Sequence, residues 1–480
     1  NMGISSLRGI EYFTHLEYLN CNSNDLTELD VSSCISLVEL YCTGNNIAEL
    51  DVRKCLKLQE LVCDDSVSII DTTAIDAENF PDEVFREYVR RFDLDGGGSL
   101  NANEIYQIKR IDVNNMGISS LRGIEYFTQL EYLNCNSNEL TELDVSNNTN
   151  LYFLSIHYNH LRSLDTSNCP DLKYVYCGEN LLTDYDPSSN PKLSFISFFH
   201  NRLTKLDLSK HTMLYYLECS SNDLTSLDVS SSPNQKYVYC YANRISELKL
   251  GRKEESILLN CGRNNLTELD ISGLPLLNGI SCANNKLKAL DVSQNPKLKE
   301  IYCHNNNIPA LDLSNNPELH TLSCTNNLLG KLDTSHNPKL RKFDCGGNYL
   351  ATLDVSNNPE LKELYFSGTT LRNVDVSLNN KLISLDCIST DIMTLDISKN
   401  ISLDALGCYG NSRLEALYIT SNDNPAYPYK TDLREYTGET FSRITAVNAY
   451  DPQDVSINSL FTQGEPVVQF SRLPQYIVYD

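Results

Sequence analysis

A stretch of twelve residues, DLDGGGSLNANE from Asp93 to Glu104, contains residue types that can hold a hard cation. Its first, third and twelfth places carry carboxylates, and the carbonyl at its seventh place supplies a further oxygen, which suits Ca²⁺. Gly98 permits the sharp turn that such a loop makes around an ion. The predicted ligands are Asp93, Asp95, Gly97, Ser99, Asn101 and Glu104. Gly97 stands where a ligating side chain is usual, so binding should be weak, and a metal-free loop that only joins two segments is the alternative.

Helices on both sides must position this loop. From Phe80 to Phe92 apolar residues recur at helical spacing, with Pro81 in the first turn, where a missing N–H is harmless. A shorter helix is predicted after the loop. The spacing resembles an EF-hand and the dockerin loops of extracellular proteins, and this resemblance implies a structural rather than a sensory role for Ca²⁺. We therefore predict an EF-hand-like helix-loop-helix cap that covers the open end of the segment following it.

The following segment is one unit repeated many times. Residues 214–234, LYYLECSSNDLTSLDVSSSPN, contain two nested half-turns, and shifts of 21 residues align fourteen registers from Leu130 to Leu403 without a gap. Stacked copies bury a continuous core that one copy could not form. The unit, seen as LHTLSCTNNLLGKLDTSHN from Leu319, resembles the nested bacterial leucine-rich repeat LxxLxCxxNxLxxLDLxxN of cell-surface and secreted proteins from gut Gram-positive anaerobes. The predicted fold is a β-rich leucine-rich-repeat solenoid.

The chain divides into four predicted segments. They are a short leucine-rich-repeat block (1–70), the helical cap or insert (71–112), the main solenoid (113–420) and a small C-terminal β module (425–480). Residues 1–32 match residues 115–146 at all but two positions. We therefore expect that the chain starts partway through a longer gene product. A helix-loop-helix similar to the predicted cap should precede Asn1, and any signal peptide should lie further upstream.

Three columns of the repeat are predicted to be structural. Fourteen cysteines, from Cys21 to Cys408, share one place that Ile156, Phe198 or Phe366 fills in other turns, so these thiols should lie free in the core as small hydrophobes. This many unpaired thiols fits a reducing or anaerobic setting. The repeated asparagine should turn inward and bond the backbone at each bend. The aspartate of each LDV or LDL segment should accept N–H groups of the turn rather than bind cations.

A run of aromatic residues is the surface feature that most favours recognition. Tyr or Phe occupies the second place after the leading residue in six consecutive turns, and further rings stand at the fourth and sixth places. These side chains should point outward from strands about 4.8 Å apart onto a concave face. A ladder that only stabilises neighbouring strands is the alternative. The predicted ligand-binding residues are Tyr132, Phe153, His157, Tyr174, Tyr176, Phe195, Phe199, Tyr216, Tyr237, Tyr239 and Tyr241.

Composition narrows the function. The net charge of -24 disfavours nucleic acid and anionic membrane surfaces as partners. No run of residues is apolar enough to insert into a membrane, and the sequence contains no HExxH, GxSxG or Gly-rich phosphate loop. With the resemblance, this predicts a non-enzymatic, secreted or cell-surface adhesion protein that binds a protein or a glycan on its aromatic face. A non-catalytic targeting or spacer part of a larger secreted enzyme is the alternative.

Overall fold

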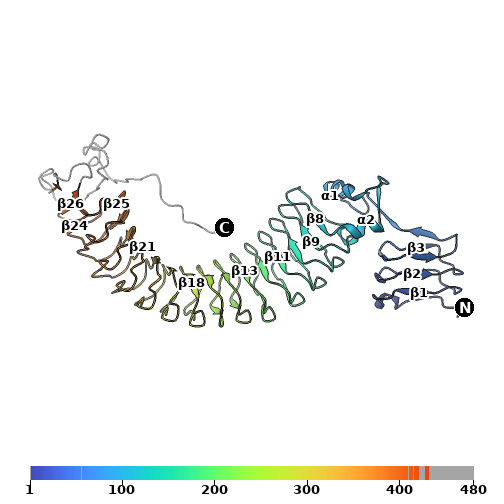
Figure 1. Ribbon diagram of the computed structural model, residues 1–480, viewed down its shortest axis with the longest axis horizontal. Coiled ribbons are helices and arrows are strands. Elements are labelled where there is room, and N and C mark those ends of the chain that lie inside the picture. Colours follow the sequence, from blue (N-terminus) through green and yellow to red (C-terminus); the bar gives the residue numbers. More distant parts are fainter. Residues whose placement is uncertain (1, 56, 409, 415, 421–427, 432–480) are drawn as a thin grey trace. The chain divides into compact units, whose positions relative to one another are not determined.

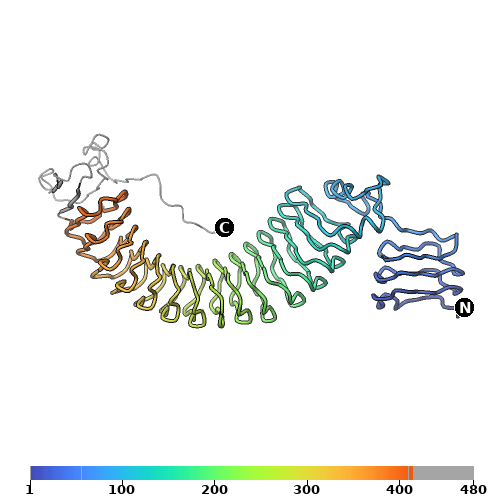
Figure 2. The backbone as a smooth tube through the Cα atoms, viewed as in Figure 1, coloured from blue at the N-terminus to red at the C-terminus, as the bar shows by residue number. Residues whose placement is uncertain are grey.

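The computed structural model divides the chain into two compact units, residues 1–214 (unit 1) and 215–480 (unit 2). The described residues are 2–55, 57–408, 410–414, 416–420 and 428–431. In each unit the chain coils through successive turns (Figures 1 and 2). Nearly every described strand has only three residues. Within this described part, no helix is long and apolar enough to cross a membrane.

The elements of unit 1 include most of the helical structure. Its strands are β1 (Tyr18–Asn20), β2 (Glu39–Tyr41), β3 (Glu49–Asp51), β4 (Glu60–Val62), β5 (Ser68–Ile70), β6 (Thr72–Ala74), β7 (Ser99–Asn101), β8 (Arg110–Asp112), β9 (Tyr132–Asn134), β10 (Phe153–Ser155), β11 (Tyr174–Tyr176) and β12 (Phe195–Ser197). Its helices are η1 (Ile10–Tyr12), α1 (Glu83–Val89), η2 (Arg90–Phe92), α2 (Ala102–Gln107) and η3 (Ile124–Tyr126), where η marks a 3₁₀ helix.

Unit 2 continues the same repeat. Its strands are β13 (Tyr216–Glu218), β14 (Ser226–Asp228), β15 (Tyr237–Tyr239), β16 (Glu247–Lys249), β17 (Ile257–Asn260), β18 (Leu277–Ser281), β19 (Glu300–Tyr302), β20 (Thr321–Ser323), β21 (Lys342–Asp344), β22 (Glu363–Tyr365), β23 (Ser384–Asp386), β24 (Thr394–Asp396), β25 (Ala405–Gly407), β26 (Ala416–Thr420) and β27 (Pro428–Thr431). Of the predicted C-terminal β module, only β27 is described, and it pairs antiparallel with β26. The rest of that module lies outside the described residues.

Parallel pairing follows the 21-residue period of the sequence. In unit 1, Leu154 of β10 is the Cα partner of Leu133 in β9 and of Val175 in β11. In unit 2, β19 to β23 pair in the same way. The middle residue of each of these strands points into the core, because side chains alternate along a strand. The solenoid predicted from the repeat is confirmed.

The repeated asparagine completes each bend, as predicted. Asn138 donates its side-chain amide to the carbonyls of Cys135 (3.0 Å) and Val113 (2.8 Å) and accepts the N–H of Ile118 (2.9 Å). The same pattern recurs through the solenoid, for example at Asn327. Backbone groups that the bend turns inward are thereby satisfied without water.

The cysteine and aspartate columns also agree with their predicted roles. None of the 17 cysteines, all of which lie in the described part of the chain, forms a disulfide, and every one except Cys63 is buried. Burial raises the pKa of the Cys324 thiol, for example. The LDV and LDL aspartates accept the N–H of the residue two places on, as Asp312 does from Ser314 at 2.9 Å. This bond lowers the pKa of the Asp312 carboxyl. The aspartate column therefore stabilises turns.

The predicted cap is a helix-loop-helix segment in unit 1. Its first helix begins later than predicted, because Asp82 is the N-cap and accepts the N–H groups of Val84 and Phe85, both at 3.0 Å, so that Pro81 precedes the helix. The apolar face of α1 buries Phe85 and Val89. Figure 1 shows α1 and α2 close to β8. The boundaries of the four predicted segments, 1–70, 71–112, 113–420 and 425–480, stay predictions.

Candidate functional site

The predicted aromatic column lies in register along four strands of unit 1. Tyr132, Phe153, Tyr174 and Phe195 are successive Cα partners. The rings of Tyr132 and Phe153 stack at 4.2 Å and 7°, and those of Tyr174 and Phe195 at 5.0 Å and 27°. Their side chains are half-buried rather than exposed. Each ring therefore presents part of its surface outward and rests on its neighbours with the remainder.

More rings lie beside this column. The centroid of His157 is 5.7 Å from that of Tyr176 and 5.3 Å from that of Phe199. Gly178 makes room for Phe199, because a Cβ on Gly178 would lie 2.3 Å from the phenyl ring. The Gly178 N–H donates to Nδ1 of His157 at 2.7 Å, and burial lowers the pKa of this imidazole. His157 is therefore neutral at pH 7. We call the aromatic face the set Tyr132, Phe153, His157, Tyr174, Tyr176, Phe195 and Phe199.

Two cations border the aromatic face. The Arg110 guanidinium lies 3.5 Å from the centre of the Tyr132 ring, and Lys173 Nζ lies 5.5 Å from that of Tyr174. Both distances permit cation–π attraction. Sequence reasoning missed Arg110, although Arg110 is the Cα partner of Tyr132 and extends the column by one turn. The face combines stacked apolar rings with phenol hydroxyls and positive charge at its border.

The remaining predicted rings belong to unit 2. Tyr216 and Tyr237 are Cα partners, with ring centroids 5.8 Å apart, and Tyr239 lies 5.8 Å from Tyr216. The Arg263 guanidinium lies 5.5 Å from the centre of the Tyr241 ring. All four tyrosines are half-buried. They form a second, smaller aromatic group.

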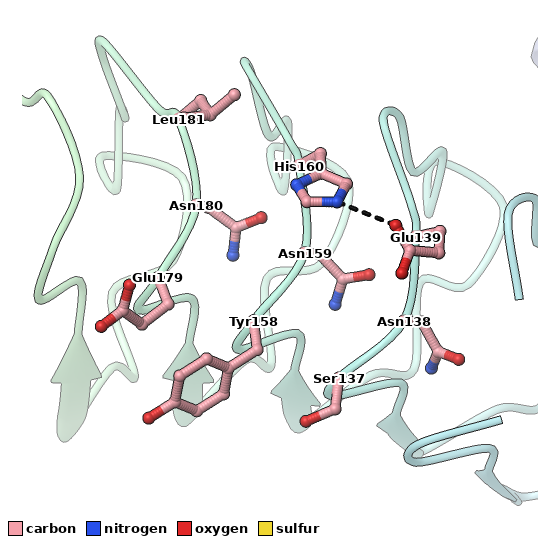
Figure 3. Close-up of a pocket in the computed structure, with 9 residues that line it drawn as sticks. All are labelled: Ser137, Asn138, Glu139, Tyr158, Asn159, His160, Glu179, Asn180 and Leu181. Atoms are coloured by element: carbon pink, nitrogen blue, oxygen red, sulfur yellow. Dashed lines mark hydrogen bonds and ion pairs between the residues drawn. The ribbon is translucent and has the colours of Figure 1, made fainter. Parts of the chain in front are cut away.

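An open hollow in unit 1 lies at the bends next to the aromatic face (Figure 3). His160 Nε2 and Glu139 Oε2 are 2.9 Å apart across it. Tyr158 is 55% exposed, and its ring centroid lies 6.3 Å from that of His157. Tyr158 was also missed, because its place in the repeat predicts only a bend residue. The lining residues are Ser137, Asn138, Glu139, Tyr158, Asn159, His160, Glu179, Asn180 and Leu181.

The predicted calcium loop brings three of its carboxylates together. One oxygen from each of Asp93, Asp95 and Glu104 lies within 4.8 Å of the others. Asp93 accepts the N–H groups of Gly96 (2.8 Å), Gly97 (3.1 Å) and Gly98 (2.8 Å), and these bonds lower its pKa. The carboxylate is therefore ionised at neutral pH.

The other predicted ligands of the loop have different surroundings. The Asn101 side chain caps α2 by accepting the N–H of Glu104 at 3.1 Å, so its oxygen is engaged by the helix. Ser99 lies in β7, which pairs antiparallel with β6. The Gly97 N–H donates to the Asp93 carboxylate in the bend that leads into β7. Of the six predicted ligands, the structure gathers the carboxylates, which are the donors that Ca²⁺ prefers.

Comparisons with known proteins identify similar solved structures. No protein-family model and no curated protein matched. A domain of InlJ from Listeria monocytogenes, described as including a cysteine ladder, is 30% identical and covers 73% of this chain and 77% of its own, with a TM-score of 0.60. An internalin (inlF) from the same organism is 22% identical, covering 70% and 97%, with a TM-score of 0.54. The LRR protein LIC12759 of Leptospira interrogans is 19% identical, covering 66% and 87%, with a TM-score of 0.51.

Proposed function

Because the chain belongs to the bacterial leucine-rich-repeat family represented by the cysteine-ladder domain of InlJ, we propose that it is a non-enzymatic scaffold that binds a protein on its aromatic face. The observation that carries this proposal is the unbroken column of four rings along β9–β12. The core of these turns is complete without the rings, since Leu133 and Leu154 are fully buried beneath the strands. The rings are therefore available for recognition.

A protein partner suits this face better than a glycan. Tyrosine is a frequent anchor of protein interfaces, because its ring supplies contact area and its hydroxyl a hydrogen bond. Stacking already restricts the rotamers of rings such as Phe153, so less entropy is lost on binding. The chain contains no Trp, which counts mildly against a glycan. A secreted or cell-surface location with an adhesive role is part of the proposal.

The experiment screens arrays of extracellular proteins and of glycans with the wild-type chain and with a Phe153→Ala/Tyr174→Ala variant. We expect binding to at least one protein that falls at least tenfold in the variant. Thr321→Ala/Ser384→Ala is the matched control, because both residues occupy the same column in unit 2. Its binding should equal that of the wild type.

The other outcomes are equally informative. A glycan signal lost in the ring variant would replace the protein with a glycan as the ligand. If no binding signal depends on the rings, the aromatic face is only a structural ladder. That outcome would also favour a spacer or targeting part of a larger secreted enzyme.

We also propose that Asp93, Asp95 and Glu104 hold a structural Ca²⁺, with Gly97, Ser99 and Asn101 completing the loop. The convergence of the three carboxylates supports this proposal. The ion would neutralise their mutual repulsion and fix the loop between α1 and α2. Isothermal titration of the metal-free protein with Ca²⁺ tests it, with Asp95→Asn as the weakened variant. Absence of binding at millimolar Ca²⁺ would leave the loop as a metal-free connection.

A further inference from the structure

Two nearly identical segments of unit 1 have different surroundings. Residues 1–32 and 115–146 differ only at His15/Gln129 and Asp25/Glu139. Their backbones agree: Gly9 and Gly123 have φ of 105° and 102°, and each precedes a 3₁₀ helix. The sequence therefore folds locally in the same way at both places.

The second segment is covered by the helix-loop-helix cap. Phe127 is fully buried, with its ring stacked on Phe80 at 6.2 Å and 25°. Ser119 donates its N–H and its hydroxyl to Asp82, both at 2.8 Å. The Tyr126 hydroxyl donates to Asn79 at 2.7 Å. Each of these contacts joins the segment to residues 79–92.

A strand completes this cover. β8 pairs in parallel with β9, and the N–H groups of Glu131 and Tyr132 donate to the Lys109 carbonyl at 2.9 and 3.0 Å. Residues 79–112 therefore supply both an apolar lid and a neighbouring strand. We call residues 79–112 the hand.

The first segment presents the same residues without this cover. Phe13, the counterpart of Phe127, is 59% exposed, and Tyr12, the counterpart of Tyr126, is 83% exposed. β1 has β2 as its one neighbour among the described strands, so its other edge is open. Ile4, Leu7 and Ile10 are only partly buried, whereas their counterparts are buried. We call residues 2–20 the end face.

One contact is particularly diagnostic. A Cβ on Gly123 would lie 2.3 Å from the Phe80 ring, so this glycine provides the seat for the phenyl group. A Cβ on Gly9 would meet nothing within 4 Å. The end face thus contains the seat, the hydroxyl and N–H donors at Ser5, and an open strand edge.

We propose that the end face is a docking surface for a second hand of the same type as residues 79–112. This occupant is a helix-loop-helix segment with an aromatic anchor for the Gly9 seat, an acidic N-cap for Ser5 and a final strand for β1. The hand already described cannot serve both places, because it covers residues 115–134. Packing of two end faces from two copies would cover the apolar residues, but the helix of the end face has Gly9 as its N-cap. It therefore brings no counterpart of Asp82, the acidic N-cap that binds Ser119.

The experiment adds a copy of residues 72–114 ahead of Asn1 in the full chain and follows amide hydrogen exchange. Residues 17–20 and 131–134 have the same sequence, EYLN, so the second stretch is an internal reference. His15 and Gln129 distinguish the corresponding peptides by mass. In the unextended chain we expect residues 17–20 to exchange at least about tenfold faster, and in the extended chain at a rate similar to that of 131–134.

The control carries Phe80→Ser in the added copy only, which removes the anchor and should restore fast exchange. Unchanged exchange in the extended chain, with the added copy folded by circular dichroism, would overturn the proposal. Sedimentation of the unextended chain, which measures its oligomeric state, is the second experiment. A dimer that slows exchange at residues 17–20, and that Phe13→Ser dissociates, would also overturn it by making a second copy the occupant.

Discussion

The same column of the repeat has opposite character in two parts of the solenoid. In β9–β12 it carries four rings of the aromatic face, those of Tyr132, Phe153, Tyr174 and Phe195. In β19–β23 of unit 2 it carries Glu300, Thr321, Lys342, Glu363 and Ser384. The core beneath is equivalent, since Leu154 and Leu322 are both fully buried. The polar stretch shows that these turns pack without rings in this column. The rings are therefore an addition to the repeat, which is why we assign recognition to them.

The largest expected effect is on stability. It should be the same in β9–β12, the aromatic stretch, and in β19–β23, the polar stretch, and it tests whether their cores are equivalent. Asn180→Ala and Asn327→Ala should each lower the free energy of unfolding by about 3–5 kcal/mol, because each leaves several buried backbone groups without partners. Urea unfolding followed by circular dichroism measures this. A large loss in one stretch only would break the comparison, since it would mean that the two cores differ.

The next effect should be confined to the aromatic stretch. For a protein found on the array, Phe153→Ala/Tyr174→Ala should lower affinity by about 2–4 kcal/mol, or about 30-fold to 1,000-fold, the range for central anchors of an interface. Surface plasmon resonance provides the affinities. Thr321→Ala/Ser384→Ala should bind as the wild type does. Equal losses in both variants would show that ring character is irrelevant.

Alanine substitution in this column should lower the free energy of unfolding in the aromatic stretch and hardly change it in the polar stretch, and this difference should be smaller than that in binding. Phe153→Ala removes a stacked, half-buried ring and should lower the free energy of unfolding by about 1–2 kcal/mol. Thr321→Ala, at the same place in unit 2, should change it by less than about 0.5 kcal/mol. Both values come from urea titrations. A loss above about 4 kcal/mol for Phe153→Ala would mean that the ring belongs to the core.

The smallest effect concerns pH. His157 and His304 occupy the same place in their turns, and burial lowers the pKa of both. The unfolded chain therefore binds protons first, so stability is complete above about pH 6.5 and falls below it. His157 should contribute more, because its Nδ1 accepts the Gly178 N–H and must lose that bond on protonation. Between pH 7 and 5, His157→Gln should reduce the loss of stability by about 1 kcal/mol or less, and His304→Gln by less still. Unfolding midpoints at both pH values provide the measurement, and a larger reduction with His304→Gln would contradict the assignment.

The sequence predicted those features that each turn repeats. The strand register, the inward asparagines, the buried cysteines and the aspartate turns follow from the period, because each turn meets the same neighbours above and below. The half-burial of the rings did not follow, since it depends on how Tyr132 and Phe153 stack on each other. Arg110 and Tyr158 were missed because one lies ahead of the first register and the other at a bend. Asn101 was predicted as a ligand, but its side chain also satisfies the start of α2.

Hydroxyl-radical footprinting of the chain with and without its array-identified protein partner tests the central claim most directly. The method oxidises accessible aromatic side chains, so the face itself is the probe. We expect the partner to reduce oxidation at Tyr132, Phe153, Tyr174 and Phe195, while Tyr302 and Tyr365 of the polar stretch change little. Protection of Tyr302 and Tyr365 with unchanged oxidation along β9–β12 would contradict the account, because the partner would then bind where the rings of this column are absent.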